Sequence, residues 1–93
     1  MEKSVFTREY DVLRSLLREV RRRCSVTQVE LAARLNETQS FVSKCERGER
    51  RLDLVQLAAF CQALHLPLVD FVQEYQQRCR PRPSSAKRAS GRK

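Results

Sequence analysis

The 93-residue sequence has no tryptophan, only one histidine and only two glycines. With a single imidazole, no glycine-rich loop and no convincing pair of carboxylates, it offers little for acid–base, phosphate or metal chemistry. Two tyrosines and four phenylalanines also leave a core that must rest mainly on Leu, Val and Ala. We therefore expect a protein that is not an enzyme and that uses no cofactor.

Long apolar runs are also missing. No stretch approaches the roughly 20 apolar residues that cross a bilayer, and the opening MEKSVFTREYD lacks the apolar segment of a secretory signal. The sequence predicts no membrane partner and a cytoplasmic location. Its length fits one domain, and 41% hydrophobic with 32% charged residues is typical of soluble globular proteins.

The cysteines are far apart in the sequence and form no close pair. They lie at Cys24, Cys45, Cys61 and Cys79, and the single His65 has no neighbouring candidate ligand. A zinc site needs closer spacing, and a secreted disulfide framework needs a signal. We expect no metal site, and we expect the first three cysteines to be reduced core residues on apolar stripes.

Positive charge is in excess, but it is spread unevenly. Of the 19 basic residues, seven lie in residues 78–93 without any acidic residue, which leaves 12 basic against 11 acidic residues in 1–77. The segment RCRPRPSSAKRASGRK cannot bury enough apolar surface to offset the entropy of ordering. We predict a domain over 1–77 and a disordered basic tail over 78–93, which either attracts DNA or another polyanion or only keeps the chain soluble.

Apolar residues at three- and four-residue steps predict five helices and no strands, so the expected fold is all-α and compact. The first helix spans residues 7–24 with Thr7 as its cap, the fourth follows an Asp53–Gln56 cap, and Pro67 opens the fifth. The expected inward face of the first helix consists of Tyr10, Leu13, Leu16, Leu17, Val20 and Cys24. That of the fourth consists of Leu54, Leu57, Ala58, Cys61 and Leu64, with Phe60 beside them. That of the fifth consists of Leu68, Phe71, Val72 and Tyr75.

Two short capped helices lie between the first and the fourth. Thr27 and Glu30 form a T-x-x-E capping box, and Asn36 ends that helix because Asn tolerates a left-handed backbone. Thr38 then caps a third helix, which Gly48 ends after residue 47. Two short helices joined in this way form a helix-turn-helix pattern.

The third helix has one apolar and one polar face. Val42 and Cys45 are expected to point inward against the second helix. Gln can bond adenine with two hydrogen bonds, Ser can bond either kind of base, and Lys prefers guanine in the major groove. A solvated polar face looks the same in a short helix, so the surrounding sequence has to decide. The polar face consists of Gln39, Ser40, Ser43 and Lys44.

The surrounding sequence resembles a known family. Residues 27–64, TQVELAARLNETQSFVSKCERGERRLDLVQLAAFCQAL, are similar to the Cro/Xre-type helix-turn-helix of phage lambda-type repressors, and with LREVRRRC and HLPLVDFV the likeness covers about residues 13–72. The resemblance implies five helices, a third helix in the major groove and homodimers that read half-sites about one turn apart. The matching features are Thr27-Gln28, Glu30-Leu31-Ala32, Gln39-Ser40, Val42 and Glu46-Arg47-Gly48.

The resemblance also assigns roles to residues. Gln28 matches a position that holds a DNA phosphate and packs on the side chain of Gln39. Arg21 and Glu46 match a structural ion pair between the first and third helices. The positions that match base-reading residues are Gln39, Ser40 and Lys44, with Ser43 beside them, and those that match phosphate contacts after the third helix are Arg47, Arg50 and Arg51.

Two positions depart from the family pattern. Asn36 stands where glycine is usual in the turn, and Cys45 stands where a large aliphatic residue is usual. The bulk of Phe41 could offset the smaller Cys45. Phe41 itself is expected in the core or half-buried, with the DNA backbone or a partner protein as alternatives. Phe71, Val72 and Tyr75 are candidates either for a dimer interface or for the core.

Together these observations predict a sequence-specific, double-stranded-DNA-binding transcriptional regulator. We expect a repressor that binds an operator as a homodimer, without a small-molecule effector, since 93 residues leave no room for an effector domain. Three alternatives stay open at this point. They are the antitoxin of a toxin–antitoxin pair, a helical protein-interaction module whose third helix binds protein, and a nonspecific nucleic-acid binder that works through the tail.

Overall fold

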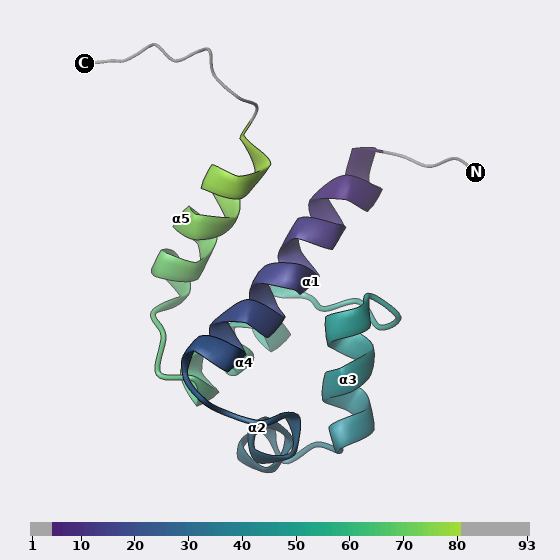
Figure 1. Cartoon of the computed structure of the whole chain (residues 1–93), viewed down its shortest axis with the longest axis vertical. Coiled ribbons are helices and arrows are strands. Elements are labelled where there is room, and N and C mark those ends of the chain that lie inside the picture. Colours follow the sequence, from purple (N-terminus) through teal and green to yellow (C-terminus); the bar gives the residue numbers. More distant parts are fainter. Residues whose placement is uncertain (1–4, 81–93) are drawn as a thin grey trace.

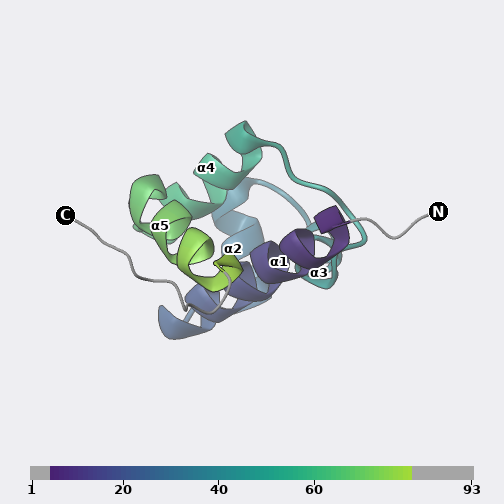
Figure 2. The same cartoon turned by 90° about the horizontal axis from the view of Figure 1, so that it is seen from above.

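The computed structural model describes residues 5–80, with side chains from Arg8 onward, and contains five α-helices and no strand in that range. The predicted all-α, five-helix fold is confirmed. Figure 1 shows α1 running beside α5, with α3 on its other side and α2 at its C-terminal end. Figure 2 looks down on this arrangement and shows α4 beside α5. The helices are α1 (Val5–Arg23), α2 (Gln28–Leu35), α3 (Gln39–Arg47), α4 (Leu54–Ala63) and α5 (Leu68–Cys79).

Both predicted capping boxes are present. The backbone N–H of Glu30 donates to Thr27 Oγ1 at 3.0 Å, and the N–H of Thr27 donates to Glu30 Oε1 at 2.8 Å. Asp53 and Gln56 form the same reciprocal pair at the start of α4, at 2.8 and 3.1 Å. Each box satisfies N–H groups that a helix start leaves without an intrahelical partner. The bond from the Thr27 backbone also lowers the pKa of the Glu30 carboxyl.

The two predicted helix stops flank α3. Asn36 ends α2 with φ of 59°, and Gly48 ends α3 with φ of 82°, both in the left-handed region. The N–H of Glu37 donates to the carbonyl of Ala32 at 2.9 Å, which closes the end of α2. The turn between α2 and α3 is therefore short and held by backbone hydrogen bonds, and this fixes the angle at which α3 leaves α2.

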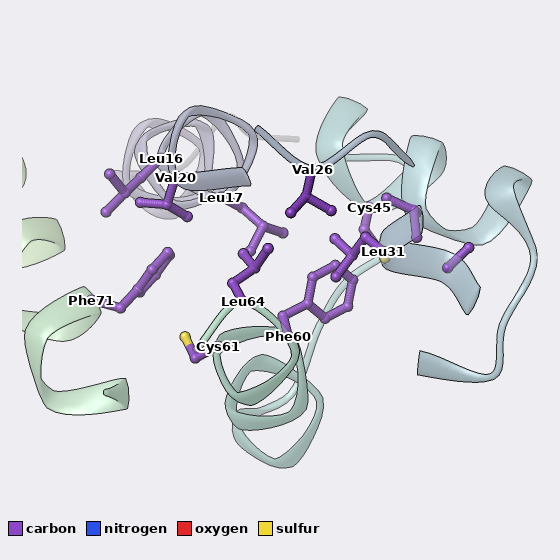
Figure 3. Close-up of a cluster of buried hydrophobic side chains, with 12 residues drawn as sticks. Leu16, Leu17, Val20, Val26, Leu31, Cys45, Phe60, Cys61, Leu64 and Phe71 are labelled. Atoms are coloured by element: carbon purple, nitrogen blue, oxygen red, sulfur yellow. The ribbon is translucent and has the colours of Figure 1, made fainter. Parts of the chain in front are cut away.

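The core lies where the five helices meet. Figure 3 shows Phe71 of α5 facing Leu16 and Val20 of α1, and Phe60 of α4 lying near Leu31 of α2. The buried apolar residues are Leu16, Leu17, Val20, Val26, Leu31, Ala32, Val42, Cys45, Phe60, Cys61, Leu64 and Phe71. Phe71 is thus a core residue, whereas Val72 and Tyr75 are half-buried.

Two of the three cysteines expected in the core are there. Cys45 and Cys61 are buried, and burial raises the pKa of each thiol to about 11, so both stay protonated near neutral pH. The prediction that Cys24 lies in the core is wrong. Helix α1 ends at Arg23, so Cys24 does not continue the apolar face of the helix and is exposed.

Two further predictions about helix ends were wrong. Thr7 is not the cap of α1, since the helix begins at Val5. Leu54 is 66% exposed although it continues the apolar stripe of α4, because only the second half of that helix is buried. Periodicity indicates which face of a helix is apolar, but it does not indicate how far the neighbouring helices extend.

The expected boundary after Gln77 falls inside α5, which continues to Cys79. Arg78 is part of that helix and pairs with Glu19 of α1, with Nη1 and Oε1 2.8 Å apart. The rest of the expected disordered tail, residues 81–93, lies outside the described residues. Between residues 5 and 80 no single helix is long and apolar enough to cross a membrane, and α4 with α5 reaches that length and composition only as a pair bent by 112°.

Arg78 belongs to a closed group of four charges that we call the α1–α5 ion cluster: Glu19, Arg23, Glu74 and Arg78. Arg23 contacts both carboxylates, at 3.2 Å to Glu19 and 2.9 Å to Glu74, and Arg78 contacts the same two. Hydrogen bonds from Arg78 and then Arg23 lower the pKa of Glu19 to about 2. The cluster links the C-terminal halves of α1 and α5 on the surface.

The left-handed stop at Gly48 gives a stability prediction. Alanine at this position would keep φ near 82° only with strain, and its Cβ would lie 2.7 Å from Arg14 Cδ. We expect Gly48→Ala to lower the free energy of unfolding by about 1–2 kcal/mol, measured by urea denaturation. Asn36→Gly is the control, because glycine fits the left-handed stop of α2 without strain. Equal stability of Gly48→Ala and wild type would contradict the prediction.

The α1–α5 ion cluster predicts a pH dependence. The pKa of Glu19 is lowered from 4.5 to about 2, so its stabilising contribution is complete above pH 4.5 and is lost as the pH falls toward 2. The difference in unfolding free energy between wild type and Glu19→Gln should therefore shrink over that interval. Thermal or denaturant melts of both proteins at several pH values measure it. A difference that stays constant down to pH 2 would show that the carboxylate is not stabilised by the two arginines.

Candidate nucleic-acid interface

Helix α3 is fixed at its start and buried on one side. The Thr38 hydroxyl accepts the N–H of Phe41 at 3.0 Å, as predicted for its cap. Val42 and Cys45 are fully buried, which confirms the predicted inward face. The opposite face leaves Gln39, Ser40 and Lys44 exposed and Ser43 half-buried.

A buried ion pair joins α3 to α1. Arg21 Nε donates to Glu46 Oε2 at 2.6 Å, and Arg21 Nη2 donates to Glu46 Oε1 at 3.0 Å. The two side chains are only 9% and 2% exposed. Arg21 Nη1 donates to the carbonyl of Val26 at 2.8 Å, so each of the three guanidinium nitrogens donates a hydrogen bond. The expected Arg21–Glu46 contact is confirmed.

The ion pair continues to the surface through two glutamines. Gln28 Nε2 donates to Glu46 Oε1 at 3.0 Å, and Gln39 Nε2 donates to Gln28 Oε1 at 3.1 Å. A carboxylate accepts hydrogen bonds and cannot donate them, so Glu46 turns the amide nitrogen of Gln28 inward and its oxygen outward. That oxygen in turn selects the nitrogen of Gln39. We call the chain Arg21–Glu46–Gln28–Gln39 the glutamine relay, and it confirms the expected contact between Gln28 and Gln39.

An open hollow of about 510 Å³ lies beside the relay, at the N-terminal end of α2. Arg22, Ser25, Thr27, Gln28 and Gln39 are among its lining residues. The positive end of the helix dipole and the Arg22 guanidinium both favour an anion there. The hollow is thus suited to a phosphate next to Gln28.

Of the three arginines at the end of α3 and just after it, two stack on aromatic rings. The Arg50 guanidinium lies 5.0 Å from the centre of the Phe41 ring, and that of Arg51 lies 4.6 Å from the centre of the Tyr10 ring. Phe41 is half-buried, as expected, with its ring centre 6.2 Å from that of Phe60. Stacking holds the face of a guanidinium and leaves its N–H edges available to other acceptors.

The third arginine is held by polar groups. Arg47 donates to the Glu49 carboxylate through Nε and Nη2, each at 3.0 Å, and to Ser43 Oγ through Nη1 at 2.6 Å. The Ser43 hydroxyl therefore keeps its own proton for an outside acceptor. The pairing lowers the pKa of the Glu49 carboxyl and raises the pKa of Arg47.

Tyr10 is a positioning residue that the sequence did not reveal in this role. It was expected only on the inward face of α1, but its hydroxyl donates to the carbonyl of Arg50 at 3.2 Å and accepts the N–H of Leu52 at 3.1 Å. These bonds fasten the segment after α3 to α1. No local pattern could have predicted a contact across 40 residues. Glu49 was also missed, although its place two residues after Arg47 is visible in the sequence.

The described residues bring the predicted site residues together on one side of α3 and at its two ends. Within residues 5–80 no three His, Cys, Asp or Glu side chains are grouped so that they could hold a metal ion. The arrangement offers amides, hydroxyls and cations, which can form hydrogen bonds and attract negative charge. Such groups suit the base edges and phosphates of DNA.

Comparisons with known proteins agree with this geometry. A family model described as a helix-turn-helix domain matches residues 12–72. An XRE-family-like protein from Pseudomonas syringae pv. tomato str. DC3000 is 38% identical, with a TM-score of 0.75 over 80% of this chain and 90% of that one. The clp gene regulator ClgR from Corynebacterium glutamicum is 28% identical, with a TM-score of 0.69 over 76% of each chain. A search of curated proteins gave no match.

A third solved structure is similar in fold. It is the restriction-modification controller protein C.Esp1396I, as a tetramer in complex with its natural 35-base-pair operator. It is 21% identical to this chain, with a TM-score of 0.72 over 83% of this chain and 97% of that one.

The buried ion pair gives the prediction of this section. Glu46→Gln removes one charge and leaves Arg21 buried without its partner, so we expect the free energy of unfolding to fall by about 3–5 kcal/mol. Thermal and urea melts measure the loss. Glu37→Gln is the matched control, because it removes the same charge from an exposed position in the turn. Melting of Glu46→Gln at the wild-type temperature would show that the pair does not hold α1 to α3.

Proposed function

The chain belongs to the Cro/Xre-type helix-turn-helix family, and from that premise we propose that it is a sequence-specific, double-stranded-DNA-binding repressor of transcription. In this proposal α3 lies in the major groove and the chain acts as a homodimer on an operator. The observation that carries the proposal is the glutamine relay, which connects a buried ion pair to an exposed side chain at the start of α3.

Gln39 is the main base-reading residue in this proposal. Its bond to Gln28 uses one N–H and leaves the amide oxygen and the second N–H free. An oxygen and an N–H side by side are the pair of groups with which glutamine bonds N6 and N7 of adenine. The relay supports this role because it holds the amide in one orientation before DNA arrives, which reduces the entropy lost on binding.

The other base-reading candidates surround Gln39. Ser40 and Lys44 are exposed on the same helix. Ser43, which already accepts a bond from Arg47 at 2.6 Å, would donate to an acceptor such as guanine O6 or thymine O4. Lys44 would favour guanine. Together with Gln39 these residues extend along one side of α3. This side is opposite to the face on which Val42 and Cys45 are buried in the core.

Phosphate contacts would fix the register. Gln28 lines the hollow at the start of α2, close to the start of α3. At the other end of α3, Arg47 is the last residue of the helix, and Arg50 and Arg51 follow it. In this proposal phosphates hold α3 at both of its ends, while the exposed residues along α3 contact the bases. Contacts to phosphates position a protein on the duplex without reading sequence.

In this proposal, repression results from the binding of a homodimer to an operator. A homodimer on two half-sites would occupy one face of the DNA and block polymerase at an overlapping promoter. The solved relatives support a regulatory role, since one is described as a clp gene regulator and another was solved on its operator. The six cations of residues 80–93, which follow α5, would add sequence-independent attraction to the selective contacts of the helical domain.

Selection of binding sites from random duplex DNA tests the proposal directly. The expected result is a palindromic consensus whose half-sites are about one helical turn apart, on the order of 10 base pairs from centre to centre. A non-palindromic consensus would retain sequence-specific binding and reject the homodimer. Absence of any enriched sequence would reject the function itself.

Substitution of the main reading residue gives a sharper prediction. Gln39→Ala should weaken binding to the selected site by about 1–3 kcal/mol and relax the preference at one base pair per half-site. Fluorescence anisotropy with the consensus and its single-base variants measures both effects. Gln62→Ala is the matched control, since it removes an exposed glutamine from α4. Unchanged affinity and unchanged base preference in Gln39→Ala would argue against reading by α3.

A further inference from the structure

The residue after the stop of α3 gives an inference that rests on the proposed function and extends it. We propose that Glu49 is an internal competitor for the DNA backbone. In the free protein its carboxylate occupies the edge of the Arg47 guanidinium that a phosphate takes in the complex. Glu49 thereby lowers the affinity of the domain for DNA of every sequence.

The geometry of the pair is that of a phosphate contact. Arg47 Nε and Nη2 donate to the two carboxylate oxygens of Glu49, each over 3.0 Å. Arginine binds carboxylates and phosphates through the same two parallel hydrogen bonds. The carboxylate of Glu49 therefore presents to Arg47 the oxygen pair that a backbone phosphate would present.

The backbone keeps Glu49 in this place. Gly48 turns the chain with φ of 82°, and the N–H of Glu49 donates to the carbonyl of Lys44 at 2.9 Å. The Tyr10 hydroxyl fastens the next residues of the segment to α1. Glu49 thus has a fixed starting point close to Arg47, and only its side chain needs to move when a phosphate arrives.

Exchange of the carboxylate for a phosphate leaves the other contact of Arg47 intact. Nη1 donates to Ser43 Oγ at 2.6 Å on a different side of the guanidinium from the Glu49 pair. Arg47 can therefore keep Ser43 oriented while its second edge passes from Glu49 to the DNA. The same arginine would then link a base-reading candidate to the backbone in the bound state.

Exposure makes the exchange feasible, and charge makes it unfavourable. The side chains of Arg47 and Glu49 are 55% and 56% exposed, so the pair is screened by water and weak. Pairing with Arg47 lowers the pKa of Glu49, which keeps the displaced group anionic at neutral pH. Once displaced, it lies near the phosphates and is repelled by them. Both effects act on the backbone contact, and neither depends on base sequence.

Arg50 and Arg51 differ from Arg47 in the kind of group that holds them. Arg50 and Arg51 are positioned by the faces of Phe41 and Tyr10, and the ion pairs of the described residues include neither of them. An aromatic ring orients a guanidinium without neutralising it. Among the ion pairs of residues 5–80, Arg47 is the one of these three arginines whose charge is matched by a carboxylate before DNA binds.

The test is a double-mutant cycle with the full chain: wild type, Glu49→Gln, Arg47→Gln and the double variant. The probes are the selected duplex and a scrambled duplex of equal length, titrated at several salt concentrations. Glu49→Gln should tighten binding to both duplexes by roughly two- to fivefold and steepen the plot of log K against log salt by up to about one ion. In the Arg47→Gln background the same substitution should change affinity much less.

Asp70→Asn is the matched control. It removes one negative charge from the first turn of α5, an element separate from α3 and the segment after it, and should leave affinity close to that of wild type. Melts of each variant check that the fold is unchanged. An equal gain from Glu49→Gln in both backgrounds would show general repulsion by Glu49 and overturn the proposal, as would no gain in either. If wild type binds neither duplex, the proposed function fails first, and this inference fails with it.

Discussion

The buried pair of Arg21 and Glu46 is the constraint on which the rest of the structure depends. Removing two charges from water is costly, and the pair is tolerated only because its hydrogen bonds are satisfied. Glu46 accepts from Arg21 and Gln28, and Arg21 also donates to the carbonyl of Val26. These bonds fix three separate segments at once: the end of α1, the start of α2 and the end of α3. The angle between α2 and α3 therefore depends on a polar contact as well as on apolar packing.

Stability and the proposed recognition use the same atoms. The Glu46 carboxylate that neutralises Arg21 also orients Gln28, and Gln28 orients Gln39 at the surface. A change at Glu46 would disturb the fold and also the orientation of the exposed Gln39 amide, whose Nε2 lies 3.1 Å from Gln28 Oε1. A change at Gln39 would affect only the last member of the relay. A substitution at the buried end of the relay is thus expected to affect both folding and binding, whereas a substitution at its exposed end is expected to affect binding alone.

Local features were predictable from the sequence because their partners lie within a few residues. The Thr27–Glu30 and Asp53–Gln56 boxes and the stops at Asn36 and Gly48 are all of this kind. The periodicity of α1 and α3 also identified their buried faces. The contact between Arg21 and Glu46, 25 residues apart, was expected only from the family resemblance. Spacing alone does not indicate which of several arginines on α1 faces a carboxylate.

Contacts over longer distances were missed. Arg23, the last residue of α1, bonds Glu74 from 51 residues away, and no local pattern indicates that contact. Tyr10 was expected to lie on an apolar face, yet its hydroxyl holds the segment after α3. Cys24 and Leu54 fit the apolar pattern and are exposed, because a pattern does not say where the packing neighbour ends. In each case the missing information was the path of another helix.

The pairing of the arginines explains how a nearly neutral domain can still present positive charge. Residues 1–77 contain 12 basic and 11 acidic residues, so net charge gives this domain little attraction for DNA. The carboxylates of Glu46, Glu19 and Glu74 are engaged by arginines of α1 and α5. Arg50 and Arg51 instead rest on aromatic rings, which hold a guanidinium in place without neutralising it, and no ion pair of the described part of the chain includes either arginine. The local field beside α3 is therefore set by the type of partner that each arginine has, and Glu49 lowers that field at one of the three positions.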